Sequence, residues 1–178
     1  MALPTINKDA VQELASGLVY VAECTQAGSI TGTPTRYGYV SGTSFDDNSS
    51  NTTQFDEGGN PVAQTDGNRE MMFKVTPMQR DKDTIEFAPK TSVGKYYTLA
   101  YRLTKKTISG SHSWLVAGIT QVARTMSLTT PGAEGPETTF TVLNNDAALT
   151  LNLTTVDAGL SSVAIAANEC WVITNVAT

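Results

Sequence analysis

The stretch that decides the fold class is SWLVAGITQVARTMSLT, residues 113–129, which is rich in apolar and β-branched side chains. This composition predicts a long β-strand, because branched side chains pack well on a pleated surface. Gly118 lies inside the stretch, and a glycine within a strand often marks a bend or a bulge. We therefore predict one long strand that bends at Gly118.

The segments that follow it continue the β pattern. TPGAEGPE (130–137) predicts a turn, and ALTLNLTTV (148–156) alternates apolar and polar residues as a strand with one buried face does. TTFTVLN (138–144) predicts a further strand, and SVAIAANECWVITNV (162–176) predicts a closing strand or a pair of strands.

The segments that precede it are also strand-like. KYYTLAYRLTKKTI (95–108) fits a helical stripe as well as a strand, and its Tyr and Thr content favours the strand. The other predicted elements are strands at 17–25 and 35–45, a hairpin of 70–78 with 84–89, and one or two helical turns at 9–16. Residues 1–178 are thus predicted to form a single, mainly β domain, a sandwich or barrel with at most one or two short helices.

Residues 46–68 (DDNSSNTTQFDEGGNPVAQTDGN) are polar and rich in Gly, Asn and Asp, which predicts a long loop with turns at Gly58-Gly59 and Asp66-Gly67. A loop of this length is uncommon in a compact domain unless it has a function. Its only large apolar side chains are Phe55 and Val62. We expect the loop to be an arm between subunits, with these two side chains as its anchors on a partner.

Charge is sorted into blocks along the chain, whose net charge is −5. Residues 37–68 carry five acidic and no basic side chains, residues 69–106 carry nine basic and four acidic ones, and no basic residue follows Arg124. Such blocks are either solvated faces or surfaces of opposite sign that attract other copies. The candidates for pairing with acid across an interface are Arg69, Lys74, Arg80 and Lys82. A pI near 4.8 argues against a protein that grips nucleic-acid phosphates.

No catalytic or cofactor motif is visible, so we predict neither an enzyme nor a cofactor. The lone His112 lies in SGSHSW, where an exposed turn residue is expected rather than a catalytic base. The carboxylates of residues 46–66 lack the EF-hand order, which leaves only a non-EF cation site as an alternative to a solvated loop. Cys24 and Cys170 lie in apolar runs and are predicted to be small buried hydrophobes. No membrane span or secretory signal is visible, so we expect a soluble protein made in the cytoplasm.

The order of these parts resembles the tail tube protein (major tail protein) of a long-tailed bacteriophage. The shared layout is an early strand pair, the polar segment 46–68, the amphipathic REMMFKVTPMQRDKDTIEFAPK (69–90) and a β-rich C-terminal half. The resemblance implies a β-sandwich that assembles into rings, hexameric by analogy, which stack into a tube. Strands of neighbouring subunits then join into a ring-wide β-barrel around a bore that carries DNA during ejection.

This resemblance also implies partners and a location. The partners are further copies of the chain and other tail proteins such as the initiator and the terminator, and the location is the virion tail, assembled in the host cytoplasm. DNA would pass without specific binding, so we expect an acidic bore because cationic walls hold phosphates. The candidates for its lining are Glu134, Glu137, Asp146 and Asp157. The alternatives are a phage head decoration (cement) protein and a tail-tip module that binds carbohydrate or a receptor.

Overall fold

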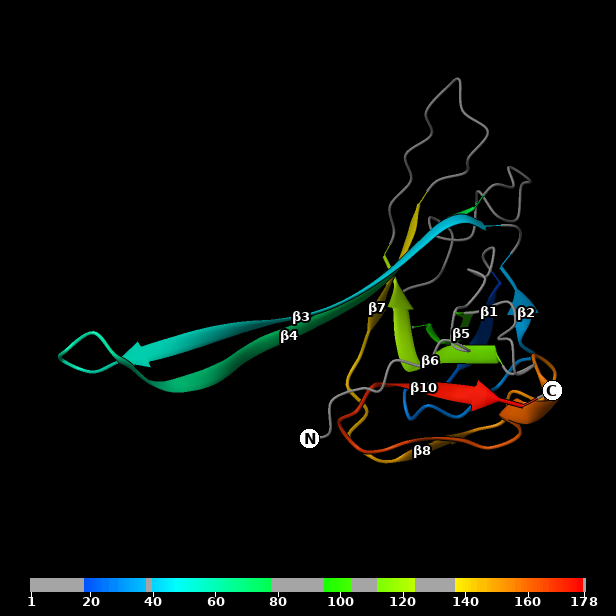
Figure 1. Ribbon diagram of the computed structural model, residues 1–178. Coiled ribbons are helices and arrows are strands. Elements are labelled where there is room, and N and C mark those ends of the chain that lie inside the picture. The colour runs from blue at the N-terminus through cyan, green and yellow to red at the C-terminus, as the bar shows by residue number, and fades with distance from the viewer. Residues whose placement is uncertain (1–17, 38–39, 78–94, 104–111, 124–136, 178) are drawn as a thin grey trace, which may run out of the picture.

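The computed structural model describes residues 18–37, 40–77, 95–103, 112–123 and 137–177 (Figure 1). These residues are mainly β, as predicted, and their only helical element is one short 3₁₀ turn. The elements are β1 (Val19–Cys24), β2 (Thr35–Arg36), β3 (Val40–Phe55), β4 (Pro61–Pro77), β5 (Tyr96–Arg102), β6 (His112–Val122), β7 (Thr138–Val142), β8 (Leu149–Leu151), η2 (Ala158–Leu160), β9 (Val163–Ile165) and β10 (Trp171–Val176). The predicted helical turns at 9–16 lie outside the described residues.

The described strands form an eight-stranded antiparallel sheet and a separate pair. The order in the large sheet is β2-β1-β5-β6-β7-β4-β3, and β10 also pairs with β6. Because β5 occupies one edge of β6, the other edge is shared: β10 pairs with residues 112–117 and β7 with residues 120–122. Beyond β6 the sheet therefore has two branches, one that consists of β10 and one that continues through β7, β4 and β3. The separate pair of β8 and β9 forms a second layer.

The division of β6 occurs at Gly118, where the predicted bend is confirmed. The register with β5 shifts between the pairs Tyr97↔Thr120 and Leu99↔Ala117, which places a bulge around Gly118. A side chain on Gly118 would meet a methyl group of Leu149 at 2.8 Å, so any larger residue requires the second layer to shift. The glycine thus bends the strand and admits the layer that covers it.

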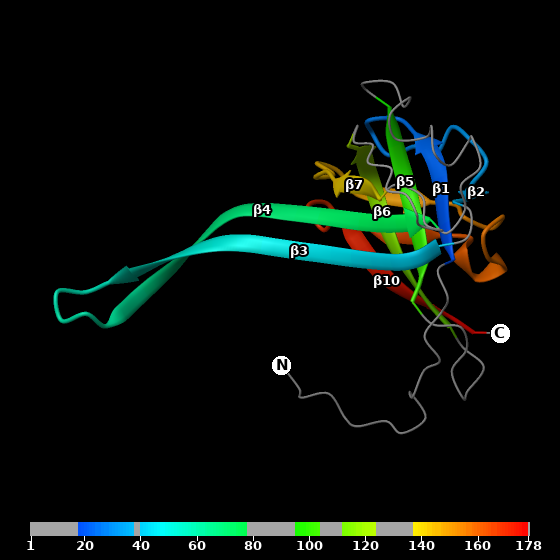
Figure 2. The same cartoon turned by 90° about the horizontal axis from the view of Figure 1, so that it is seen from above.

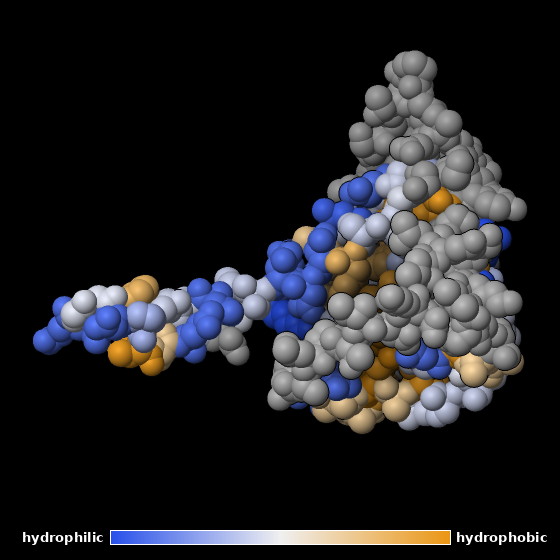
Figure 3. All heavy atoms as spheres, viewed as in Figure 1, coloured by the Kyte–Doolittle hydropathy of each residue, from blue (hydrophilic) through white to orange (hydrophobic). Residues whose placement is uncertain are grey.

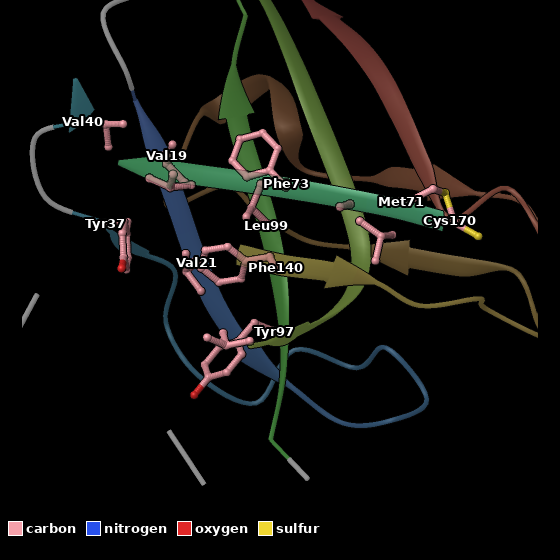
Figure 4. Packing of buried hydrophobic residues seen from close by; sticks show 14 residues of the cluster. Val19, Val21, Tyr37, Val40, Met71, Phe73, Tyr97, Leu99, Phe140 and Cys170 are labelled. Carbon is pink, nitrogen blue, oxygen red and sulfur yellow. The ribbon is translucent and has the colours of Figure 1, made fainter. Parts of the chain in front are cut away.

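Two hydrophobic clusters cover opposite faces of β1, β5 and β6. The first joins these strands to β4 and β7 through buried side chains such as Phe73, Leu99 and Phe140 (Figure 4). The second joins them to β8, β9 and η2 through Trp114 and Leu160, among others. Burial on both faces explains why β6 is apolar along most of its length rather than alternating.

One strand prediction is corrected at the C-terminal end. The strand expected at 148–156 is only Leu149–Leu151, because the chain turns after it: the Thr154 amide donates to the Asn152 side chain and the Val156 amide to the Leu153 carbonyl. Residues 162–176 form the predicted pair, β9 and β10, which a turn separates. The strand prediction for 95–108 is confirmed over Tyr96–Arg102.

The largest correction concerns residues 46–68, which are not a loop. They form most of a long β-hairpin in which β3 pairs with β4, and only residues 56–60 form the turn. Gly58-Gly59 is a turn, as predicted, whereas Asp66-Gly67 lies within β4. Backbone hydrogen bonds between strands do not depend on apolar side chains, so a polar segment extends as a strand once its neighbour continues beside it.

The predicted hairpin of 70–78 with 84–89 is also corrected where the structure describes it. Between Met72 and Val75, β4 has β3 on one edge and β7 on the other, so no third strand can pair there. Residues 84–89 lie outside the described residues. The predicted strand at 35–45 is divided between β2 and the start of β3.

Candidate functional site: a projecting arm and its anchor

The most unusual feature of the structure is the outer part of the β3–β4 hairpin, residues 48–70, which we call the arm. Every side chain that the structure describes in this segment is exposed. Figures 1 and 2 show from two directions that the arm extends away from the rest of the molecule. A two-stranded ribbon is only marginally stable alone in water, so the arm gains little by folding on itself.

The arm is anchored at its base by Asp47. Its carboxylate accepts a hydrogen bond of 2.7 Å from Nε of Arg69, a second one from Nη2 of the same residue, and one of 2.9 Å from Nε1 of Trp171. The Arg69 guanidinium holds the pKa of the Asp47 carboxyl below its usual value. Because the three residues belong to β3, β4 and β10, this anchor joins the arm to the body at three strands.

Aromatic side chains continue the anchor into the core. Phe45 lies 5.2 Å from Trp171 and 6.3 Å from Phe73, and Phe73 lies 5.3 Å from Tyr101, measured between ring centroids. Tilted and edge-to-face rings at these distances attract one another in addition to burying apolar area. The base of the arm is therefore a packed part of the body, whereas the arm itself packs against nothing that the structure describes.

A bulge separates the anchored base from the outer arm. The register passes from Ser49↔Arg69 to Asn51↔Asp66, so β4 carries one extra residue there. At Gly67 a side chain would lie 1.9 Å from the Ser50 carbonyl oxygen, which only glycine avoids. Bulges increase the local twist, and Figure 2 shows the two strands crossing between base and tip. The bulge therefore sets the orientation of the outer arm.

The tip combines a rigid acidic turn with apolar side chains. Oδ1 of Asp56 accepts hydrogen bonds from the amides of Gly58 (2.9 Å) and Asn60 (2.7 Å). Hydrogen bonds from the backbone N–H and then from the side chain of Asn60 lower the pKa of Asp56, which favours its charged carboxylate in the exposed turn. Beside it, Phe55 and Val62 are each 63% exposed, and apolar residues are visible at the end of the arm in Figure 3. Both predicted anchors therefore lie at the tip, on opposite strands.

The predicted basic interface residues are not gathered together among the described residues. Arg69 is paired with Asp47 in its own chain. Lys74 is half-buried on β4, and the structure gives it no ion pair with another described residue. Arg80 and Lys82 lie outside the described residues, so the pairing of this basic block with acid on a neighbouring copy stays a prediction.

The residues predicted to line an acidic bore differ in how exposed their side chains are. Glu137 is exposed just before β7, and Asp146 is exposed in a turn, where it accepts a hydrogen bond of 3.0 Å from Asn144. Glu134 lies outside the described residues. Asp157 instead turns inward and is engaged within the body.

His112 is not the exposed turn residue that its sequence context predicts. It begins β6, is 6% exposed, and its Nε2 lies 2.5 Å from Oδ2 of Asp157. Trp114 donates to the same oxygen at 3.3 Å, and the Gly159 amide donates to Oδ1 at 3.0 Å. The sequence did hold one signal for the burial of His112. It lies two residues before Trp114, and residues two apart share one face of a strand. The polar residues around His112 favoured the prediction of an exposed turn instead.

This buried pair is suited to a structural role. Burial raises the pKa of Asp157, and hydrogen bonds from His112, the Gly159 amide and Trp114 outweigh that effect, so the pKa is lowered overall. The ionised carboxylate caps η2 and ties it to β6. Sequence reasoning missed this cluster and also missed Asp47 and Trp171, whose contact joins residues 124 positions apart.

The described residues contain no group of three or more His, Cys, Asp or Glu side chains placed to hold a metal ion. Within the same part of the chain, no helix is long and apolar enough to cross a membrane. Cys24 and Cys170 are buried free thiols, as predicted.

Comparison with known proteins finds no matching family model and no significantly similar curated protein.

Proposed function

We propose that this chain is a structural subunit that polymerises through its arm, of the kind that stacks as rings into the tail tube of a long-tailed bacteriophage. The observation that carries this proposal is an arm that is firmly anchored at Asp47 yet exposed on every side beyond it. Rigid attachment lowers the entropy that is lost on binding, which is what a segment that engages a partner requires. The order of parts in the sequence resembles that family over most of the chain, with the difference that residues 46–68 form a hairpin and not the expected loop.

The energetics of the tip support contact with another molecule. Phe55 and Val62 remain mostly in water in the single chain. Burying such side chains contributes about 1.5–3 kcal/mol each, and an added strand or surface would also stabilise the marginal ribbon. A contact between the arm of one copy and the body of the next is heterologous, and such contacts close into rings or continue as helices.

The acidic character of the chain supports passage of DNA without retention. Each phosphate held by a cation must be released before a duplex can advance, so a bore without Lys or Arg clusters lets it slide. Glu137 and Asp146 are the exposed candidates for such a lining. Asp157 is a weaker candidate because its carboxylate is already bound by internal donors.

The proposal is tested by shortening the arm. Replacing residues 50–68 with Asn-Gly joins the paired residues Ser49 and Arg69 by a two-residue hairpin turn and leaves the anchor and the core intact. We expect a folded monomer that forms no rings or tubes, while the full chain forms them as concentration rises, by negative-stain microscopy and sedimentation velocity. The matched control is Thr52→Ala with Thr53→Ala, which changes two exposed arm residues but keeps the tip.

Two results would contradict the proposal. One is a full-length chain that stays monomeric at high concentration, with and without a phage tail initiator. The other is a shortened chain that still forms tubes of normal length. Addition of the chain only to a preformed capsid shell would instead favour the decoration protein.

A further inference from the structure

A notch lies beside β4 at the base of the arm. β7 pairs with β4 only from Met72 to Val75 and then leaves it, since the Leu143 amide already bonds to the Ile119 carbonyl on β6. The edge of β4 at residues 69–71 therefore continues without a strand beside it in the part of the chain that the structure describes. An open strand edge presents unpaired backbone donors and acceptors to another chain.

A hollow of about 430 Å³ opens at this notch. Its apolar lining is Met71, Val142, Leu143 and Cys170, and its polar lining is Arg69, Glu70, Thr141, Asn144 and Asn168. Figure 4 shows Met71 and Cys170 together at one end of the core cluster, so the hollow lies against the end of that cluster. An opening onto the apolar core next to an open strand edge is suited to a strand that carries an apolar side chain.

Two other hollows of similar size are more polar. One, of about 450 Å³, lies between residues 29–34 and 150–155 and is lined mainly by hydroxyl and amide side chains. The other, of about 490 Å³, has polar lining residues such as Gln26 and Asp146 beside apolar ones such as Ile119 and Leu149. The notch differs from both because residues 69–71 of β4, at the base of the arm, line it.

We propose that the notch receives the arm tip of a second copy, with Phe55 or Val62 in the hollow and the incoming strand beside residues 69–71. This deepens the proposed function and rests on it, because it names the site on the neighbour that the arm occupies. Each copy carries one tip and one notch. The apolar side chains that a single chain leaves in water at the tip are thereby matched by an apolar opening on the next copy.

One chain cannot fill its own notch. Val62 and Glu70 are eight residues apart on the same strand, which corresponds to about 26 Å at ~3.3 Å per residue. Tip and notch are therefore different surfaces at opposite ends of the arm. Their contact is heterologous, and each added copy presents a new notch or a new tip for the next.

Disulfide trapping tests the proposal on the full chain. One preparation carries Val62→Cys and a second carries Glu70→Cys, and the two are mixed during assembly and oxidised. Both preparations also carry Cys24→Ala and Cys170→Ala, because the Cys170 thiol lines the hollow and would compete for the incoming cysteine. A disulfide requires Cα atoms within about 7 Å, so a cross-linked pair places tip and notch in contact. The matched control for the acceptor is Thr150→Cys, an exposed residue of a polar hollow.

We expect cross-linked dimers on non-reducing gels with the Glu70→Cys partner, at least tenfold more than with the Thr150→Cys partner, and only under conditions that allow assembly. Tubes that form without this cross-link, or with more cross-linking at Thr150, overturn the notch while the proposed function stands. Dimers from the Val62→Cys preparation alone, in the same amount, indicate contact between tips and also overturn it. Absence of any polymer overturns the proposed function itself.

Discussion

The anchor at the base of the arm predicts a specific loss of stability in the variant Asp47→Ala. The change removes both hydrogen bonds to Arg69 and the one to Trp171. The side chain of Arg69 is 43% exposed and regains water, so its share is about 1 kcal/mol or less. The indole N–H of Trp171 is half-buried and loses a charged acceptor, which costs about 1–2 kcal/mol.

The expected total is a decrease of about 2 kcal/mol in the free energy of unfolding, equivalent to a Tm lower by about 4–8 °C for a chain of this size. Urea unfolding followed by tryptophan fluorescence measures it, with the slope m unchanged. The matched control is Asp46→Ala, which removes the neighbouring carboxylate. Asp46 is also half-buried, and the structure gives it no hydrogen bond with another described residue, so we expect a change below about 0.5 kcal/mol.

Equal losses in the two variants would refute this reasoning, because they would reflect the general charge of the strand rather than the anchor. The same decrease in unfolding free energy is then measured for Asp47→Ala in a chain that already carries Trp171→Phe. If the decrease is as large there as in the wild-type background, the indole contributes nothing to the anchor. The contact with the indole is expected to supply most of the decrease in unfolding free energy, so this second comparison tests the predicted size of the decrease.

Three further predictions concern the arm, the buried pair and pH. Gly67→Ala should disrupt pairing at the bulge and speed chymotryptic cleavage within the arm several-fold, whereas Gly58→Ala, which meets only side-chain atoms, should not. Asp157→Ala should lower the unfolding free energy by about 2–3 kcal/mol, because it leaves the buried His112 and the start of η2 without their acceptor; thermal unfolding measures this. The pKa of Asp47 is lowered on folding, so its stabilisation is present above about pH 4 and disappears as pH falls through the folded pKa; acid titrations should therefore show a weaker pH dependence in Asp47→Asn than in the wild type.

Local pattern was sufficient for the strands that have a buried face. Leu149, Leu151 and the residues of β6 carry apolar side chains in strand-like order, and the sequence places glycine where β6 bends. Burial of these side chains has a local signature: a strand covered on one face, such as β8, alternates apolar and polar residues, and a strand covered on both faces, such as β6, is apolar along most of its length. Composition likewise determined the mainly β class and the exposed apolar pair Phe55 and Val62.

The arm illustrates what the sequence could not determine. Residues 48–54 (NSSNTTQ) show no apolar periodicity, because neither face of this ribbon is buried in the chain. Its strand character comes from pairing with β4, which begins at the packed base and propagates outward through backbone hydrogen bonds. A method based on side-chain pattern therefore predicts a loop where the backbone forms a strand.

The sequence by itself determined the mainly β class and the polar segment with its two apolar side chains. Only the tertiary structure decided that this segment is an anchored arm, that Asp47 meets Trp171, and that His112 is buried against Asp157. The physical reason is distance along the chain. Contacts such as these join residues 45 to 124 positions apart, and their hydrogen bonds leave no local periodicity from which they could be predicted.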